Sequence, residues 1–272
     1  MKKTILITGT STGIGRAAAL HFANNGWNVI ATMRTPEKET ELNTVENITV
    51  SRLDLEDVPS IEKSINDAID KFGQIDVVVN NAAFGQFGPF EAITPEQVRK
   101  QFDVNVFGTM NVIRAILPHF RKNKAGMILN VSSAGGRIGL PLMSIYMASK
   151  FALEGFSESL SYELASQNIV VKLVEPGGVD TPFNTKAFGN FSHNPAIPDY
   201  DDYAAAYSKK TDAMRSDLTS PEEVAEGIYT AVTDGQDTLR YAVGDDAKGW
   251  IQARTSMSDS EYTPYMREIF KV

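Results

Sequence analysis

Short runs rich in β-branched residues alternate along the chain with longer segments of helical periodicity, and this rhythm restricts the fold more than any other feature. The runs are apolar without regular alternation, as expected of strands covered on both faces. Between them, segments such as 61–72 and 95–121 place apolar residues at helical spacing. The pattern predicts an α/β fold, a single doubly wound (Rossmann) domain with a parallel sheet between two helical layers. The predicted strands cover residues 4–8, 28–33, 48–53, 75–79, 127–131, 169–174 and 239–243.

One domain, residues 1–272, accounts for the whole chain. A protein of 272 residues with 42% hydrophobic and 22% charged residues can bury a large core without disulfides or a structural metal. The sequence has no cysteine, which excludes disulfides, thiol nucleophiles and cysteine-based zinc sites. Composition shifts at about 182–216, a segment rich in Asn, Asp, Ala, Tyr and Phe and interrupted by Pro195 and Pro198. We interpret it as a substrate-loop insertion.

Charge and hydropathy argue against two classes of partner. The formal net charge is −8, and the sequence has no basic block to grip nucleic acid or anionic lipid. No apolar stretch reaches the length of about 18 residues that a membrane span needs, and the apolar run near the N-terminus is too short for an export signal. A cytoplasmic protein is therefore expected. His21, His119 and His193 lack the spacing of metal ligands, so no metal site is predicted.

A glycine-rich segment at 8–15, Thr-Gly-Thr-Ser-Thr-Gly-Ile-Gly, separates the first predicted strand from a helix predicted at 13–25. Gly9, Gly13 and Gly15 permit a tight turn, while the helix N-terminus offers unpaired N–H groups to a pyrophosphate. A turn of this kind can also be purely structural. Its place after the first strand favours dinucleotide binding.

The end of the second predicted strand bears on the choice of cofactor. A doubly wound fold usually presents a carboxylate there to the ribose 2′-hydroxyl, but this chain has Met33 followed by Arg34. A guanidinium suits a 2′-phosphate, so the sequence predicts NADP(H) as the preferred cofactor, with NAD(H) as an alternative. The competing interpretation of Arg34 is a solvated loop residue. Thr12 stands where many NADP-preferring proteins have a basic residue, which leaves dual use open.

Ser133, Tyr146 and Lys150 form the third chemical feature. Tyr and Lys at positions i and i+4 share one helix face, so the phenol and the ammonium can point into one cleft. The ammonium and a cationic nicotinamide are expected to lower the pKa of the phenol from its ordinary value near 10, which makes Tyr146 an acid or base. Ser133, at the end of a predicted strand, could bind the substrate oxygen. Such a Tyr-Lys pair is weak evidence alone, but its placement after the fifth strand strengthens it.

Taken together, these motifs resemble the short-chain dehydrogenase/reductase family over residues 2–182. Residues 8–15 match its cofactor turn, and Asn80-Asn81-Ala82-Ala83 resembles its Asn-Asn-Ala-Gly signature. The segments 31–34 and 175–179 resemble the branch of 17β-hydroxysteroid and retinol dehydrogenases and bacterial carbonyl reductases. The family usually has glycine at Ala83, where a left-handed backbone would cost the methyl group about 1 kcal/mol.

The resemblance implies a strand order of 3-2-1-4-5-6-7 and a set of site residues. The implied catalytic residues are Asn105, which would hold a water for proton relay with Lys150, together with Ser133, Tyr146 and Lys150. Lys150 would also bind the nicotinamide ribose. The implied cofactor-binding residues are Gly9, Ser11, Thr12, Gly13, Ile14, Gly15, Arg34, Asp54, Leu55, Asn81, Ala82, Tyr146, Lys150, Pro176, Gly177, Val179 and Thr181.

The function predicted from these features is an NADP-dependent oxidoreductase that transfers a hydride between nicotinamide and a small-molecule alcohol, ketone or aldehyde. A catalytically weak NAD(P)-binding sensor or regulatory protein is the first alternative, but a sensor has no need of the complete catalytic set. An epimerase or dehydratase is the second; such proteins tend to have a different glycine spacing and a larger C-terminal domain.

Two further expectations concern surfaces. The helix that carries Tyr146 continues through Phe151, Leu153, Phe156, Leu160 and Leu164, which is more apolar surface than one sheet face needs. With the resemblance, this predicts a homodimer or homotetramer. The insertion is expected to form a mobile lid with an aromatic wall over the substrate, built from Phe183, Phe188, Phe191, Tyr200, Tyr203 and Tyr207.

Overall fold

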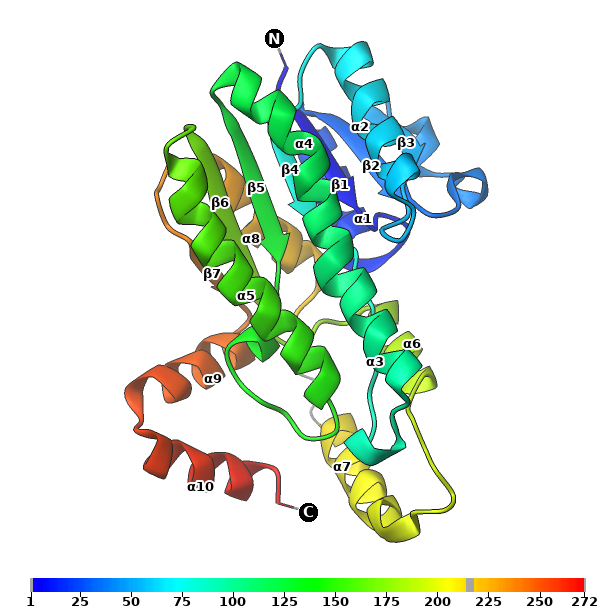
Figure 1. Ribbon diagram of the computed structural model, residues 1–272, viewed down its shortest axis with the longest axis vertical. Coiled ribbons are helices and arrows are strands. Elements are labelled where there is room, and N and C mark those ends of the chain that lie inside the picture. The colour runs from blue at the N-terminus through cyan, green and yellow to red at the C-terminus, as the bar shows by residue number, and fades with distance from the viewer. Residues whose placement is uncertain (1, 214–217, 272) are drawn as a thin grey trace.

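In the computed structural model, which describes residues 2–213 and 218–271 without the side chains of residues 184, 188 and 213, a parallel sheet forms the centre of the molecule. Its seven described strands follow the order β3-β2-β1-β4-β5-β6-β7, which confirms the order expected from the family (Figure 1). The strands are β1 Thr4–Thr8, β2 Asn28–Met33, β3 Ile48–Arg52, β4 Val77–Asn80, β5 Gly126–Val131, β6 Ile169–Pro176 and β7 Arg240–Val243.

The strand boundaries differ from the predicted ones where hydrogen bonding departs from the apolar pattern. Ile75 is apolar, but its N–H donates to Nε2 of His119 at 3.2 Å instead of to a neighbouring strand, so β4 begins two residues later. At the other end, β6 runs on to Pro176 because Glu175 and Pro176 pair in register with residues of β7.

Helices cover both faces of the sheet, as doubly wound topology requires. On one face, α1 (Gly13–Asn24) and α8 (Pro221–Thr233) pack against alternate strand residues such as Ile5 and Ile7. On the other, α2 (Val58–Phe72), α4 (Thr109–Asn123) and α5 (Ser144–Ala165) pack against the intervening residues, among them Leu6. Because successive side chains of a strand point to opposite faces of the sheet, every central strand buries side chains on both faces.

The helix predicted at 95–121 is divided into three pieces. A capping box between Thr94 and Gln97 begins α3 (Pro95–Phe102), as the sequence indicates. A turn of π-helix, η4 (Asp103–Gly108), follows and leads into α4. Because a π turn inserts an extra residue, it changes the direction in which the side chains of η4 point. The remaining short helices are η1 Pro36–Lys38, η2 Leu42–Thr44, η3 Phe90–Ala92 and η5 Ala134–Gly136.

The predicted insertion contains α6 (Pro182–Gly189), η6 (Pro198–Tyr200) and α7 (Asp201–Ala213); its residues 214–216 lie outside the described part. Buried Gln86 fastens it to the body of the protein, because its Nε2 donates to the backbone O of Asn190 at 2.6 Å and to Oγ of Ser192 at 3.0 Å. A lid would therefore move around a fixed point at 190–192.

Two C-terminal helices, α9 (Asp245–Ser256) and α10 (Asp259–Ile269), complete the chain. Figure 1 shows α7, α9 and α10 beyond the ends to which the strands point. Tyr207 of α7 packs with Met266 and Phe270 from the C-terminal segment and with Ile138. In the described part of the chain, none of the helices combines the length and apolar character needed to cross a bilayer.

Candidate functional site

A cavity of about 910 Å³ lies at the carboxyl ends of the strands and brings most of the predicted site residues together. This is the place where a parallel α/β sheet offers a crevice to ligands. Gly15 and Asn105 do not line it. From the predicted set, it is lined by Gly9, Ser11, Thr12, Gly13, Ile14, Arg34, Asp54, Leu55, Asn81, Ala82, Ser133, Tyr146, Lys150, Pro176, Gly177, Val179 and Thr181.

The glycine-rich turn leaves the start of α1 open. Gly9 and Gly13 have φ of 73° and 58°, which a side chain would strain. A side chain on Gly15 would overlap the backbone O of Gly9, so Gly15 serves the close packing of the turn. Thr12 precedes α1 but its side chain caps no N–H, whereas Asp57 and Ser220 cap α2 and α8. Uncapped N–H groups at a helix N-terminus fit a pyrophosphate.

Asn81, which directly follows β4, holds this turn in place. Its Nδ2 donates to the backbone O of Thr8 at 2.9 Å and of Gly9 at 3.2 Å. In return, Oγ1 of Thr8 accepts the N–H groups of Asn81 at 3.0 Å and Ala82 at 3.1 Å. Ala83 does not have a positive φ, so the methyl group carries no left-handed penalty at this departure from the family signature.

At one end of the cavity, Arg34 follows β2 and is exposed, with no ion-pair or hydrogen-bond partner among the described residues. The nearby Arg16 differs, because it is bound to Glu39 at 2.8 Å and to Glu41 at 2.6 Å. Arg34 is therefore available to a ligand. Asp54 lines the same end, and its Oδ1 accepts the N–H of Glu56 at 3.2 Å.

The ion pair of Glu56 and Lys100 also borders this end of the cavity and was not predicted. The two residues are 44 positions apart and come from different elements. Nothing in the local sequence of either residue indicates the pairing, because it depends on how α3 crosses the loop after β3.

Tyr146 lies at the base of the cavity, in the first turn of α5, with 7% of its surface exposed. Its hydroxyl is hydrogen-bonded to that of Ser133, which itself accepts the N–H of Gly135 at 3.0 Å. The rings of Phe87 and Phe183 both lie 5.8 Å from the Tyr146 ring, centroid to centroid. Burial raises the pKa of Tyr146 to about 12, although the bond to Ser133 acts in the opposite direction.

Lys150 lies one helical turn further along α5 and is buried. Its Nζ donates to the backbone O of Val131 at 2.9 Å and is 5.8 Å from the centre of the Tyr146 ring. Burial lowers the pKa of Lys150 to about 8, and the negative charge of Glu154 opposes that shift. The net effect of the protein's own groups is opposite to the expected lowering of the Tyr146 pKa, because desolvation of the phenol outweighs the other contributions. The contribution of a cationic nicotinamide, which the expectation also included, stays a prediction.

Asn105 lies on η4 outside the cavity wall. Its Oδ1 accepts the N–H of Phe84 at 2.8 Å, and its Nδ2 donates to the O of Phe84 at 2.9 Å and to Oγ of Ser149 at 3.1 Å. The amide group thus ties the segment after β4 to α5. Because the amide is used in this way, a water for proton relay would have to meet the main-chain O, to which Thr109 donates at 3.1 Å.

Asp246 is a cavity residue that sequence reasoning missed. Residues 245 and 246 begin α9, and Asp246 accepts the N–H groups of Gly178 and Ala247, both at 2.7 Å. A side chain on Gly177 would overlap the carboxylate of Asp246. Asp246 therefore fixes the segment after β6 that the family resemblance assigns to the nicotinamide. The glycine that precedes α9, followed by two acidic residues, is the sequence signal that could have indicated a helix start at Asp246.

The expected aromatic wall is only partly correct. Phe183 and Tyr207 line the cavity, while Tyr200 and Tyr203 are exposed and Phe191 faces another pocket; the side chain of Phe188 lies outside the described part. The C-terminal helices supply the rest of the wall, through Trp250 and Phe270. Sequence reasoning overlooked these two residues because they follow the part of the chain that carries family motifs.

Comparison with known proteins agrees with this geometry. Residues 3–190 match the family model of short chain dehydrogenases. The chain is 34% identical to retinol dehydrogenase 8 of Bos taurus, over 88% of this chain and 80% of that protein. It is 32% identical to 17-beta-hydroxysteroid dehydrogenase type 1 of Homo sapiens, over 99% of this chain and 86% of that protein.

Solved structures show the same fold with cofactors bound. ElxO with NADP bound superposes with a TM-score of 0.75 at 29% identity, covering 89% of this chain and 97% of that one. A 3-ketoacyl-(acyl-carrier-protein) reductase from Brucella melitensis complexed with NADH has a TM-score of 0.73 at 25% identity, covering 90% and 98%. The family match, the relatives and the fold together establish that this chain belongs to the short-chain dehydrogenases and is an oxidoreductase of that family.

Proposed function

We propose that the protein is an NADP-dependent oxidoreductase that interconverts an alcohol with a ketone or aldehyde. The observation that carries the proposal is the pair of hydrogen-bonded hydroxyls of Tyr146 and Ser133 beside Lys150, in one cavity with the open N-terminus of α1. The relatives named above act, by their names, on retinol and on a 17-beta-hydroxysteroid, and both names denote hydroxyl compounds.

A bound nicotinamide supplies or accepts the hydride in such a reaction. In the direction of reduction, Ser133 holds the carbonyl oxygen and Tyr146 gives it the phenolic proton. The resulting phenolate is stabilised by the ammonium of Lys150, and a cationic nicotinamide would act in the same direction. A pKa of about 8 allows Lys150 to exchange protons with solvent near neutral pH and so to restore the phenol. Asn105 acts as a positioning residue, through Phe84 and Ser149.

Three observations support NADP(H) over NAD(H). Arg34 lines the cavity without a partner among the described residues, Met33 places no carboxylate there, and ElxO binds NADP. The relative complexed with NADH shows that the family fold also accepts the other cofactor. A sensor or regulatory protein is disfavoured by the complete Ser-Tyr-Lys set.

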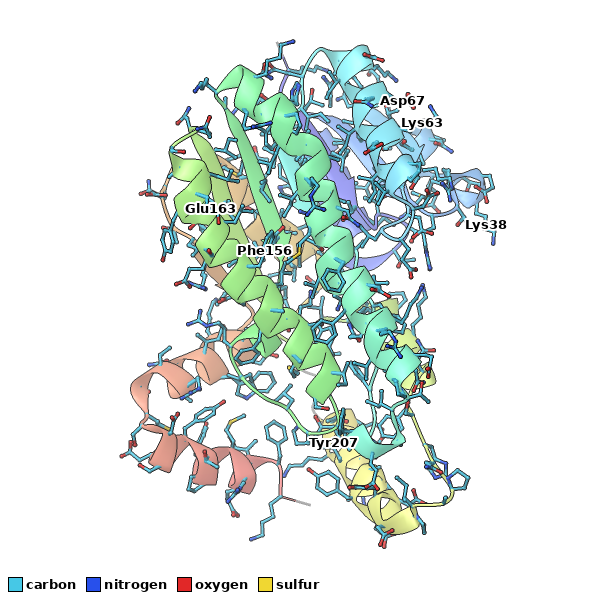
Figure 2. The ribbon with its side chains drawn as sticks, viewed as in Figure 1. Lys38, Lys63, Asp67, Phe156, Glu163 and Tyr207 are labelled. Carbon is cyan, nitrogen blue, oxygen red and sulfur yellow. The ribbon has the colours of Figure 1, made fainter. Side chains whose placement is uncertain are left out.

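We further propose that the protein forms a homodimer or homotetramer through α5. Leu153, Leu160 and Leu164 are buried within the protein itself, so they do not contribute to the apolar surplus expected from the sequence. Phe151 remains exposed, and Figure 2 shows the partly buried Phe156 on the same helix. A cytoplasmic location stays a prediction from the sequence.

Replacement of Tyr146 tests the proposed function. Tyr146→Phe removes the proton donor and keeps the ring, so reduction of ketones or aldehydes should slow by at least about a hundredfold, the scale of positioned acid–base catalysis. NADPH oxidation followed at 340 nm measures the rate, and NADPH binding by fluorescence should stay within about twofold. Tyr162→Phe, at an exposed position of α5, is the matched control. Near-normal turnover in Tyr146→Phe would refute the mechanism.

A further inference from the structure

The cavity continues past Tyr146 between apolar walls. Near Tyr146 the wall consists of a cluster with Phe87 and Met147, and further out of a cluster that contributes Trp250 and Phe270. Leu140 contacts both clusters and also lines the cavity, so the two walls are continuous. A substrate bound with its reacting oxygen at Tyr146 therefore extends along apolar surface toward α7 and α10.

Tyr207 places a polar group in this apolar outer half. Only 4% of the residue is exposed, and it lines the cavity. Figure 2 shows it where α7 meets the loop between β5 and α5, whose Ile138 belongs to the same cluster. Its ring is held on one side by Phe270, at a centroid distance of 6.2 Å, and is stacked on Tyr203 at 6.5 Å. The hydroxyl is thus fixed in position.

The hydroxyl of Tyr207 has no hydrogen-bond partner in the described part of the protein. Burial raises the pKa of Tyr207 to about 12, so the group is a neutral phenol that can donate and accept. Although the residue is buried, its hydroxyl is not among the enclosed polar atoms that lack a partner, so a ligand in the cavity can reach it. Tyr262 likewise has no partner among the residues that the structure describes, but its hydroxyl is enclosed by the protein and the residue does not line the cavity. The hydroxyl of Tyr207 borders the cavity.

A second hydroxyl follows one helical turn later. Thr211 also lines the cavity, and because its Oγ1 donates to the backbone O of Ser208 at 3.0 Å, it can still accept a hydrogen bond. Residues four apart lie on the same face of a helix. The outer end of the apolar channel therefore carries a donor at Tyr207 and an acceptor at Thr211, which together suit a hydroxyl group.

We propose that the substrate is an elongated, mainly apolar alcohol or ketone with a second oxygen, preferably a hydroxyl, at its far end, and that Tyr207 binds this distal oxygen. The inference rests on the proposed function, which places the reacting oxygen at Tyr146. It adds a polar subsite to that function, and with it a length requirement, because the two oxygens must reach Tyr146 and Tyr207 at the same time.

Matched ketones test the subsite. The probes are unbranched 2-alkanones of eight to fourteen carbons and the same ketones with a terminal hydroxyl. The wild-type protein with NADPH should favour the hydroxylated member of one or two adjacent pairs by about threefold to tenfold in kcat/KM, the scale of one neutral hydrogen bond. The gain should appear in KM. Tyr207→Phe keeps the stacked ring but removes the hydroxyl, so it should reduce that ratio to about one. Tyr203→Phe should keep the ratio, because Tyr203 does not line the cavity.

Calorimetric titration of the same pairs into the NADPH-bound variants separates the two proposals. If ketones are reduced but the terminal hydroxyl improves neither kcat/KM nor binding at any length, or if Tyr207→Phe keeps the preference, the subsite is refuted and the oxidoreductase function stands. If no ketone is reduced but a hydroxylated ketone binds more tightly and Tyr207→Phe abolishes the difference, the subsite stands and the proposed function fails. If neither turnover nor binding distinguishes the pairs, the subsite is refuted.

Discussion

Arg34 should determine which cofactor the protein prefers. It lines the cavity and has no partner in residues 2–213 and 218–271, so its guanidinium is available to a 2′-phosphate. A charge-assisted hydrogen bond contributes about 1.5–3 kcal/mol, and solvent around an exposed guanidinium reduces this toward the lower limit. That limit corresponds to about a tenfold preference in kcat/KM for NADPH over NADH. Arg34→Ala should therefore bring the two cofactors to near equality, and adding Met33→Asp should reverse the order by repelling the phosphate.

The assay compares initial rates with NADPH and NADH on one ketone at two salt concentrations. The preference of the wild-type protein should shrink at high salt, because an exposed charge contact is screened. Arg52→Ala is the matched control: Arg52 is also an exposed arginine at a strand end, but it is bound to Asp57 at 2.7 Å and does not line the cavity. A wild-type protein that favours NADH, or an Arg34→Ala variant with an unchanged ratio, would show that Arg34 is a solvated loop residue.

Two further predictions concern the cofactor segment and the subunit contact. Asp246→Ala leaves the N–H of Gly178 unpaired and should weaken NADPH binding by about tenfold in a fluorescence titration, whereas Asp246→Asn restores part of the affinity and Asp245→Ala has no effect. Phe151→Lys should convert an oligomer of micromolar protein to monomers in light scattering, because it puts a charge into an apolar contact; a monomeric wild-type protein would contradict the proposed assembly.

The features that sequence analysis predicted well are those encoded locally. A strand buried on both faces must be apolar, so the runs at 4–8 and 28–33 coincide with β1 and β2. A glycine-rich turn after such a strand fixes the location of a ligand site, since parallel strands present their carboxyl ends at one edge. Ser133 and Tyr146 both follow the fifth strand, so the sequence also indicates that they lie at this edge of the sheet.

The features that were missed depend on contacts between distant segments. Asp246 acts through Gly178, 68 residues away, and Phe270 enters the cavity because α10 packs on α7. The pKa of Tyr146 also depends on contacts between distant segments. Its neighbour Lys150 can be read from the sequence, but the burial that dominates depends on Phe87 and on Phe183 of α6. Pattern and spacing indicate which groups meet, but the extent to which these groups are desolvated depends on all the residues that cover them.

Lys150 provides a pH test that separates chemistry from folding. Its pKa is about 8 in the native protein and 10.5 for an unperturbed lysine. Between these values the unfolded chain holds a proton that the native protein has lost, so this group makes native stability rise with pH. Reduction should change in the opposite direction. If the charged lysine stabilises the phenolate, kcat/KM for reduction should fall above pH 8 and approach a tenfold loss per pH unit. Falling activity with rising stability excludes unfolding as the cause.

The carboxylate of Glu154 should set where this fall begins. Glu154 is buried on α5 one turn beyond Lys150, where its charge raises the pKa of the lysine, and its Oε2 is bound to Arg240 at 2.9 Å. Glu154→Gln removes that charge with little change in shape, so the break in the rate profile should move to lower pH. Glu158→Gln is the control, because Glu158 also binds Arg240 but does not affect the pKa of Lys150. If the break stays near pH 8 in Glu154→Gln, or moves equally in both variants, then Lys150 is not the group whose titration controls reduction.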